Sequence, residues 1–374
     1  NRVSDAVEFK CTVQHPAWRE VQNYYVPDYQ HSVVEDAITR PELKGCATAT
    51  NLIFPTVETW VTLMVQALPA PFVVGPDGED AKEVTEYLQA WEDAQGVAEE
   101  IQRALRNTAI IGTGAMKVYW DPKADDVRRR SVDPWSIFPE PGAKNLVCHD
   151  CTFVCLRHVY SRSYVEHRWP DVTLDRPEPY SGDKTELESP TALDLWKTNL
   201  KDMLVVWEVW DSFGEEYCVY TGKTWLQKPV ENPTPGQQFP IGLYRARPND
   251  YDLWGQPWIP YVKDIQDEIN RLHSRMSIHS KFAAAPVYWS DDQMITDQDV
   301  TPGTIVKMKT PGTKLGSLSH EQLGPEVMNA LLKLQQDFDT ISGIQAVLQG
   351  VRPKGSTSGI MIQSLVERAD MRAT

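Results

Sequence analysis

Two long helical patterns that flank a short β segment constrain this chain more than any other feature of its sequence. After Pro260, apolar residues recur at positions 262, 265, 269, 272 and 276, a spacing that predicts a helix ending before Pro286. Its 24 residues, 262–285, would span roughly 36 Å. A second helix is predicted from Pro325 to a stop at Gly343. The chain should run out along one helix and return along the other.

The segment between these helices is predicted to be a compact β insert. It starts with Val-Tyr-Trp at 287–289, and two identical Thr-Pro-Gly-Thr turns, 301–304 and 310–313, bracket a predicted strand at 305–309. Proline followed by glycine suits the two central positions of a type II turn. The insert is therefore expected to be a small β tip.

The earlier part of the chain changes from a helical to a strand-like period. Residues 1–75 have a helical pattern, and 77–111 predict two acidic amphipathic helices that meet at Gly96. Segments rich in β-branched and aromatic residues then predict a small antiparallel sheet or barrel. They are 115–120, 152–160, 203–211, 215–220 and 225–228, with short helices at 164–169 and 192–200. The predicted fold class is α+β and mainly helical.

Composition sets limits on the partners of the chain. The formal net charge is −15 over 374 residues, whereas a protein that grips duplex DNA tightly should be basic. An acidic surface suits a protein past which DNA slides without sticking, and it equally suits simple solubility. Six cysteines in a chain of this length indicate a reducing compartment rather than a disulfide scaffold.

The apolar run 52–68 raises the question of a membrane span. It has 17 residues, contains Glu58, and is interrupted by Pro55 and followed by Pro69 and Pro71. That length lies at the short limit for crossing a bilayer. We expect a buried helix and no membrane contact.

Several motifs resemble catalytic or metal sites without meeting their requirements. Cys148, Cys151, Cys155 and His158 have types suited to zinc, but Cys155 and His158 should point to opposite faces of one strand. Gly-Thr-Gly at 112–114 follows a helix and precedes a strand, the reverse of a dinucleotide fingerprint. The segment 350–357 lacks the lysine of a phosphate-binding loop. We therefore expect no enzyme, no metal and no cofactor.

The segment 343–359 is distinguished by its charge. It contains Arg352 and Lys354 but no acid, and it is rich in glycine, glutamine and serine. It is either an ordinary polar linker or a loop that touches phosphate groups.

Five segments, taken in order, resemble parts of tailed-bacteriophage portal proteins. The segment 51–76 resembles their N-terminal wing, as do 109–121 and 132–139 together. Residues 254–286 resemble the stem helix that enters the clip, while 341–344 and 350–359 resemble the second stem helix and the channel loop. The likeness covers the chain from about residue 50 to 374.

The resemblance implies a portal fold and a ring, usually of twelve copies, at one capsid vertex of the virion. Double-stranded DNA would be packaged, retained and ejected through the ring without sequence recognition. The implied partners are the terminase large subunit, a head-tail adaptor, and the major capsid and scaffolding proteins. The protein would be made in the host bacterial cytoplasm. Portal proteins are not known as enzymes, which agrees with the failed motif search.

The same resemblance implies a division of the chain. The wing would be 1–260, the two stem helices 261–285 and 325–342, the clip 286–324, and the channel loop 343–359. Residues 360–374 would return toward the wing, and the helical crown of the family is missing from this sequence. Both ends look clipped, since the chain starts at Asn1 and ends inside a helical pattern.

Three sets of site residues follow from these assignments. Residues expected to pack the stem around the ring are Val262, Ile265, Ile269, Leu272, Met276, Leu331, Leu334 and Phe338. Residues expected on the channel loop, facing DNA, are Gln345, Gln349, Arg352 and Lys354. Residues expected on the docking rim of the clip are Trp289, Asp291, Asp292, Lys307 and Lys309.

Two other classes of function stay open. A helical hairpin could serve an adaptor that binds other proteins and passes no DNA. A metal-dependent nuclease could use the abundant acids, although their number alone indicates nothing.

Overall fold

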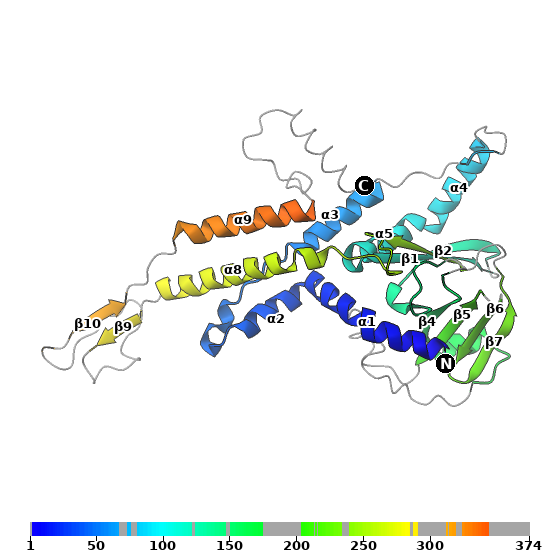
Figure 1. The fold of residues 1–374 in the computed structure, drawn as a ribbon, viewed down its shortest axis with the longest axis horizontal. Helices are drawn as coiled ribbons and strands as arrows, with labels where there is room; N and C mark the ends of the chain where they lie inside the picture. The colour runs from blue at the N-terminus through cyan, green and yellow to red at the C-terminus, as the bar shows by residue number, and fades with distance from the viewer. Residues whose placement is uncertain are drawn as a thin grey trace. The chain divides into compact units, whose positions relative to one another are not determined.

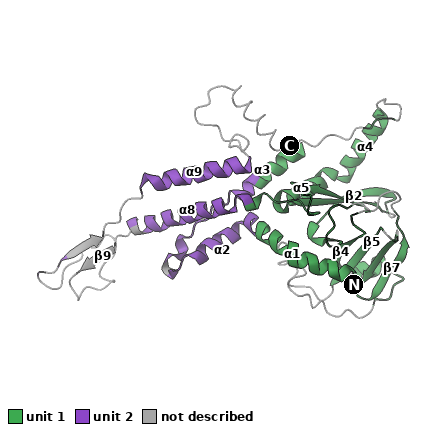
Figure 2. Cartoon of the chain, in the orientation of Figure 1, with its two compact units in different colours: residues 1–22, 57–260, 356–374 green, residues 23–56, 261–355 purple. Residues whose placement is uncertain are grey.

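The structure, a computed structural model, is shown in Figure 1. It describes residues 2–66, 73–75, 81–121, 124–146, 150–174, 203–212, 214, 216–233, 239–284, 287–290, 312, 314–318 and 324–343. Of these, residues 2–22 and 57–260 belong to a first compact unit, and residues 23–56 and 261–343 belong to a second (Figure 2). Mixed helix and sheet confirm the predicted α+β class.

Most of the α-helices precede residue 112 or follow residue 262, and they include both predicted long ones. The α-helices are α1 Arg2–Tyr25, α2 Pro27–Ala37, α3 Ile53–Gln66, α4 Lys82–Gln95, α5 Val97–Ile111, α6 Arg162–Arg168, α8 Lys263–Ala284 and α9 Pro325–Ser342. Short 3-10 helices are η1 Pro41–Cys46, η2 Pro134–Ser136 and η4 Ile259–Tyr261. Gly96 and Gly343 end their helices with positive φ, a conformation that favours glycine.

The strands form antiparallel sheets. They are β1 Thr113–Asp121, β2 Asp126–Val132, β3 Ile137–Pro139, β4 Phe153–Ser161, β5 Met203–Asp211, β6 Glu216–Thr221, β7 Thr224–Glu231, β8 Ile241–Arg245, β9 Val287–Ser290 and β10 Leu315–Leu318. In unit 1, one sheet has the order β2-β1-β8 and the other β3-β4-β5-β6-β7. The sheet alternative of the sequence analysis is therefore the one observed.

The five-stranded sheet carries a core on each face. On one face, Phe138, Phe153 and Cys155 pack against Ala6 and neighbouring side chains of α1. On the other, Val206 and the side chains around it pack against α6. Alternation of side chains along each strand separates the two cores.

A close backbone approach explains the glycines at the junction of α5 and β1. A Cβ on Gly112 would lie 2.4 Å from the Gly255 carbonyl oxygen, and one on Gly114 would lie 2.0 Å from the Ala104 carbonyl oxygen. The Gly-Thr-Gly segment is thus a helix-to-strand turn, as its order indicated.

The run 52–68 contains α3, which buries one face only. Ile53, Val57 and Val61 are buried, whereas Phe54 is 43% exposed. Among the described residues, no helix combines the length and the apolar character needed to cross a membrane.

Candidate functional site: the helix pair of unit 2

The helices α8 and α9 are joined by an apolar seam. Ile269, Leu272 and Leu331 form its buried centre, and partly buried apolar side chains of both helices pack around them. The packing partners are Leu52, Ile265, Met276, Val327 and Leu334. A heptad-like spacing on both helices produces this arrangement, because side chains three and four residues apart share one face.

The predicted stem residues are thus placed mainly inside one chain. Val262 and Phe338 are also buried, at 0% and 1% exposure. The side chains of the seam already have partners between α8 and α9, so the predicted role of the stem residues between copies of the chain stays a prediction. The helices agree closely with their predicted ranges, 262–285 and 325–342.

A second face of α8 holds an extended segment by its backbone. The Leu52 N–H donates to Gln266 Oε1 at 3.0 Å, and Gln266 Nε2 donates to the Thr50 carbonyl oxygen at 2.7 Å. One helical turn further on, the Thr50 N–H donates to Asn270 Oδ1 at 2.8 Å. The side chains of α8 therefore bond the segment as a neighbouring strand would.

The ladder continues for one more turn and reaches α2. The Thr48 N–H donates to Ser274 Oγ at 2.9 Å, and that hydroxyl donates to the Thr48 carbonyl oxygen at 3.1 Å. Asn270 Nδ2 donates to Gln30 Oε1 at 3.0 Å, and Gln30 Nε2 donates to the Tyr24 carbonyl oxygen at 2.7 Å. The polar side chains are buried, and these hydrogen bonds offset the cost of burying them.

The periods of helix and strand explain why the ladder fits. Positions 266, 270 and 274 rise about 6.0 Å per step along the helix. Positions 52, 50 and 48 advance about 6.6–6.8 Å per step along an extended chain. The small mismatch between the two steps allows three successive sets of hydrogen bonds, the rungs of the ladder, made by Gln266, Asn270 and Ser274. Sequence analysis missed these rungs because polar residues give no hydrophobic period.

The other predicted sites can be placed only in part. The channel-loop residues, 345–354, lie outside the described residues, as do Asp291, Asp292, Lys307 and Lys309 of the predicted clip. Trp289 belongs to β9, where its backbone pairs with Gly316 of β10. The Ala192–Leu200 helix and the 305–309 strand also fall outside the described residues.

The zinc alternative meets the predicted obstacle in the strand β4. Cys155 lies in the core beneath α1, whereas His158 Nε2 lies 2.9 Å from Glu208 Oε2 on the opposite face. The Cys151 thiol donates to the Phe153 carbonyl oxygen at 3.1 Å. Cys148 is outside the described residues, and those residues hold no cluster of three or more metal-ligating side chains.

Glu208 is a buried acid of unit 1. Burial would raise its pKa, but the Lys117 ammonium at 2.5 Å and the hydrogen bond with His158 outweigh burial and lower the pKa to about 2. A carboxylate held so firmly in its ionised form is a poor proton acceptor. Because Lys117 is on β1 and Glu208 on β5, the pair ties the two sheets of unit 1 together.

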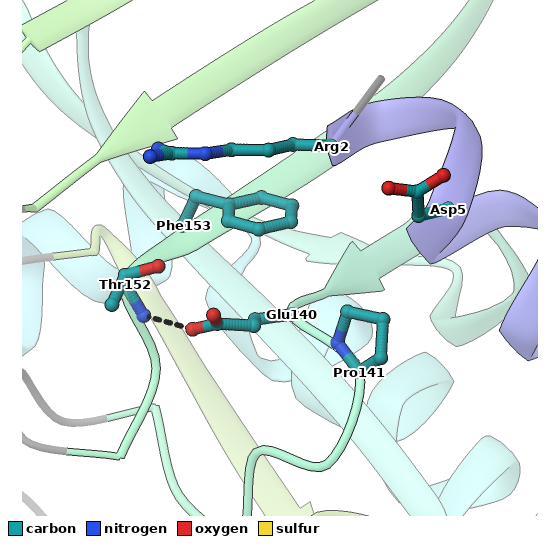
Figure 3. Close-up of a pocket in the computed structure, with 6 residues that line it drawn as sticks. All are labelled: Arg2, Asp5, Glu140, Pro141, Thr152 and Phe153. Carbon is teal, nitrogen blue, oxygen red and sulfur yellow. Dashed lines mark hydrogen bonds between the residues drawn. The ribbon is translucent and has the colours of Figure 1, made fainter.

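A shallow pocket of about 430 Å³ lies where α1 meets the end of β4 (Figure 3). Two of its polar groups are already paired. Arg2 binds Asp211 at 3.0 Å, and the Thr152 N–H donates to Glu140 Oε2 at 2.7 Å. The pocket therefore offers little unsatisfied polarity to a ligand.

The C-terminal part of the chain is similar to a known protein family. Residues 211–374 match the family model of the phage P22-like portal protein, a range that contains α8, β9, β10 and α9. No curated protein matches the chain. Members of the matched family are structural, non-enzymatic phage proteins that form oligomers associated with the capsid. The matched range contains the segments 254–286, 341–344 and 350–359, and the match confirms the resemblance there. The segments 51–76, 109–121 and 132–139 lie outside the matched range, so their resemblance stays a prediction.

Proposed function

We propose, on the premise that this chain is a phage portal protein, that it forms a ring at one capsid vertex through which double-stranded DNA is packaged, retained and ejected. The observation that carries the proposal is the family match over the range that contains α8, α9 and the β9–β10 pair. In this proposal α8 and α9 are the stem, residues 286–324 the clip, and 343–359 the channel loop.

The exposed face of α9 supports ring formation. Its main packing partner among the described elements is α8, yet Met328 and Leu332 stay 51% and 52% exposed. They lie one turn apart, so they form one apolar strip. Full burial of such a side chain contributes about 1.5–3 kcal/mol, so covering the exposed half of both would contribute about 2 kcal/mol per interface. A neighbouring copy would supply the cover in a closed ring.

The pairing of β9 and β10 supports the proposed clip. Val287 pairs with Leu318 and Ser290 with Leu315, which brings the two ends of the insert together. Such a tip can fold as a local unit and offer a docking rim to the terminase large subunit or a head-tail adaptor. Deletion of residues 290–318 with a short linker should leave unit 1 folded and abolish binding to the terminase in a pull-down.

The mass of the assembled particle tests the proposal most directly. Native mass spectrometry or light scattering of the full chain should show a ring near twelve copies, 42.5 kDa each. A monomer or dimer at concentrations far above micromolar would contradict the portal proposal and favour the adaptor. DNA cleavage that requires a divalent metal would favour the nuclease.

A further inference from the structure

One helix of unit 2 lacks the acidic excess of the chain along half its length. Residues 269–290 contain no aspartate or glutamate, although 52 acids in 374 residues would place about three in such a stretch. The same 22 residues contain Arg271, Arg275 and Lys281. They include the C-terminal half of α8, so this half-helix is locally basic.

Arg271 and Arg275 lie on a face of α8 that the described part of the chain leaves exposed. Ile269, Leu272 and Met276 face α9, and Gln266, Asn270 and Ser274 hold the extended segment. Arg271 and Arg275 fall between these two faces, one turn apart. Both are exposed, the side chain of Arg271 at 57%.

The helix dipole does not account for these two arginines. Cations stabilise a helix C-terminus, but the effect fades within the last turn. The helix ends at Ala284, which is nine residues beyond Arg275 and 13 beyond Arg271. Only Lys281 lies in the last turn.

Ion pairing accounts for little of the pattern. Arg271 lies 2.5 Å from Glu268, an exposed pair three residues apart that contributes a few tenths of a kcal/mol. Arg275 makes no ion pair within the described part of the chain. Besides the paired Glu268, the acids of α8 before Arg275 are Asp267 and Asp264, eight and 11 residues away. They lie about 12 and 16 Å from it along the axis, beyond the Debye length of about 8 Å.

We propose that the Arg271–Arg275 face of α8 contacts the phosphate backbone of double-stranded DNA, an inference that rests on the proposed portal function. A guanidinium presents several N–H donors to phosphate oxygens and stays charged at every relevant pH. Phosphate contacts carry no sequence information, which suits a duplex that moves past the helix. The face with these arginines is then the side of the stem that meets the duplex.

The test compares two variants of the full chain, one that loses two cations from α8 and a control that loses one cation from α9. The first is Arg271→Gln with Arg275→Gln, and the control is Lys333→Gln, which removes one exposed cation from α9 in the same unit. Each protein is first sized by light scattering. Its binding to a short fluorescent DNA duplex is then measured by anisotropy over a series of salt concentrations.

The arginine variant should form rings of normal size, bind the duplex more weakly, and lose roughly one unit or more of salt slope. Each phosphate contact contributes about 0.9 to that slope. The control should keep most of the wild-type affinity and slope. The inference is overturned if the wild type does not bind DNA at low salt, if the arginine variant matches it, or if Lys333→Gln loses as much. Loss of rings in the arginine variant alone would make this face a contact between copies instead. Absence of rings in the wild type would refute the portal function itself.

Discussion

His15 should make the stability of unit 1 fall steeply in acid. Its ring is 2% exposed, with its centroid 4.7 Å from that of Trp135, and neither ring nitrogen has a hydrogen-bond partner among the described residues. Burial, followed by the charges of Lys10, Arg157 and Arg19, lowers the pKa from 6.5 to about 3. The Trp135 backbone opposes this shift weakly, without reaching hydrogen-bond geometry.

The sign and size of the effect follow from proton linkage. Below pH 6.5 the unfolded chain takes up a proton at His15 that the folded chain refuses until about pH 3. Stability is therefore complete above pH 6.5 and decreases as the pH falls. At about 1.36 kcal/mol per unit, the loss is about 3 kcal/mol at pH 4 and at most about 5 kcal/mol below pH 3. Such a loss is a large part of an ordinary unfolding free energy of about 5–15 kcal/mol.

The substitution His15→Phe isolates the contribution of His15 protonation to the free energy of unfolding. Phenylalanine keeps a ring against Trp135, cannot titrate, and loses no hydrogen bond, so it should be neutral or stabilising at pH 7. Urea unfolding followed by tryptophan fluorescence at pH 7, 6, 5 and 4 gives the free energy of both proteins. The advantage of the variant should grow by about 3 kcal/mol from pH 7 to pH 4. A constant difference would refute the reasoning, and His31→Phe, at an exposed position of α2, is the control.

Three further predictions concern unit 2 and the segment after it. Asn270→Leu should destabilise unit 2 by about 2–4 kcal/mol, because the hydrogen bond to the Thr50 N–H and the bond to the buried Gln30 amide are both lost, as urea unfolding would show. Met328→Asp with Leu332→Asp should leave the fold intact by circular dichroism but give monomers in sizing, whereas Ile269→Asp should unfold the helix pair itself. Replacing both basic residues of 343–359 by glutamine should leave ring size unchanged and change DNA retention, with a difference from the wild type that shrinks as salt rises. Retention equal to that of the wild type at all salt concentrations would make that segment a linker.

Hydrophobic period and turn chemistry were sufficient to predict much of the fold. The helix predicted at 262–285 is observed at Lys263–Ala284, and the strand predicted at 203–211 is observed with those bounds. The strand β2 was missed because three consecutive arginines, 128–130, hide its alternation. One of them, Arg129, binds Glu92 of α4 at 3.1 Å, a contact between segments that no local pattern indicates.

The sequence analysis was weakest where polar side chains organise the fold. The assignment of 1–260 to a wing stays a prediction, and the structure groups 23–56 of that range with α8 and α9. The bonds behind this grouping come from Gln266, Asn270 and Ser274, which look like an ordinary polar helix face in the sequence. They form a ladder only because their four-residue spacing on the helix matches the two-residue spacing of an extended segment that lies 214–226 residues away in the sequence. That partner cannot be inferred from the helix alone.

The hydrogen-bond ladder also determines which face of α8 stays exposed and can contact other molecules. An apolar seam by itself leaves a helix free to rotate or slide by small steps, because apolar contacts are not directional. Hydrogen bonds to a backbone are directional, so a shift of α8 by one residue would break the buried rungs to Gln266 and Asn270 together. The seam and the ladder thus fix both the rotation and the axial position of α8 within its unit. With those two faces committed, Arg271 and Arg275 are held on the third at a constant angle. In a ring, every copy would then present its two arginines at the same height along the axis. The arginines of all copies would form one continuous positive band facing the regularly spaced phosphates of a DNA duplex.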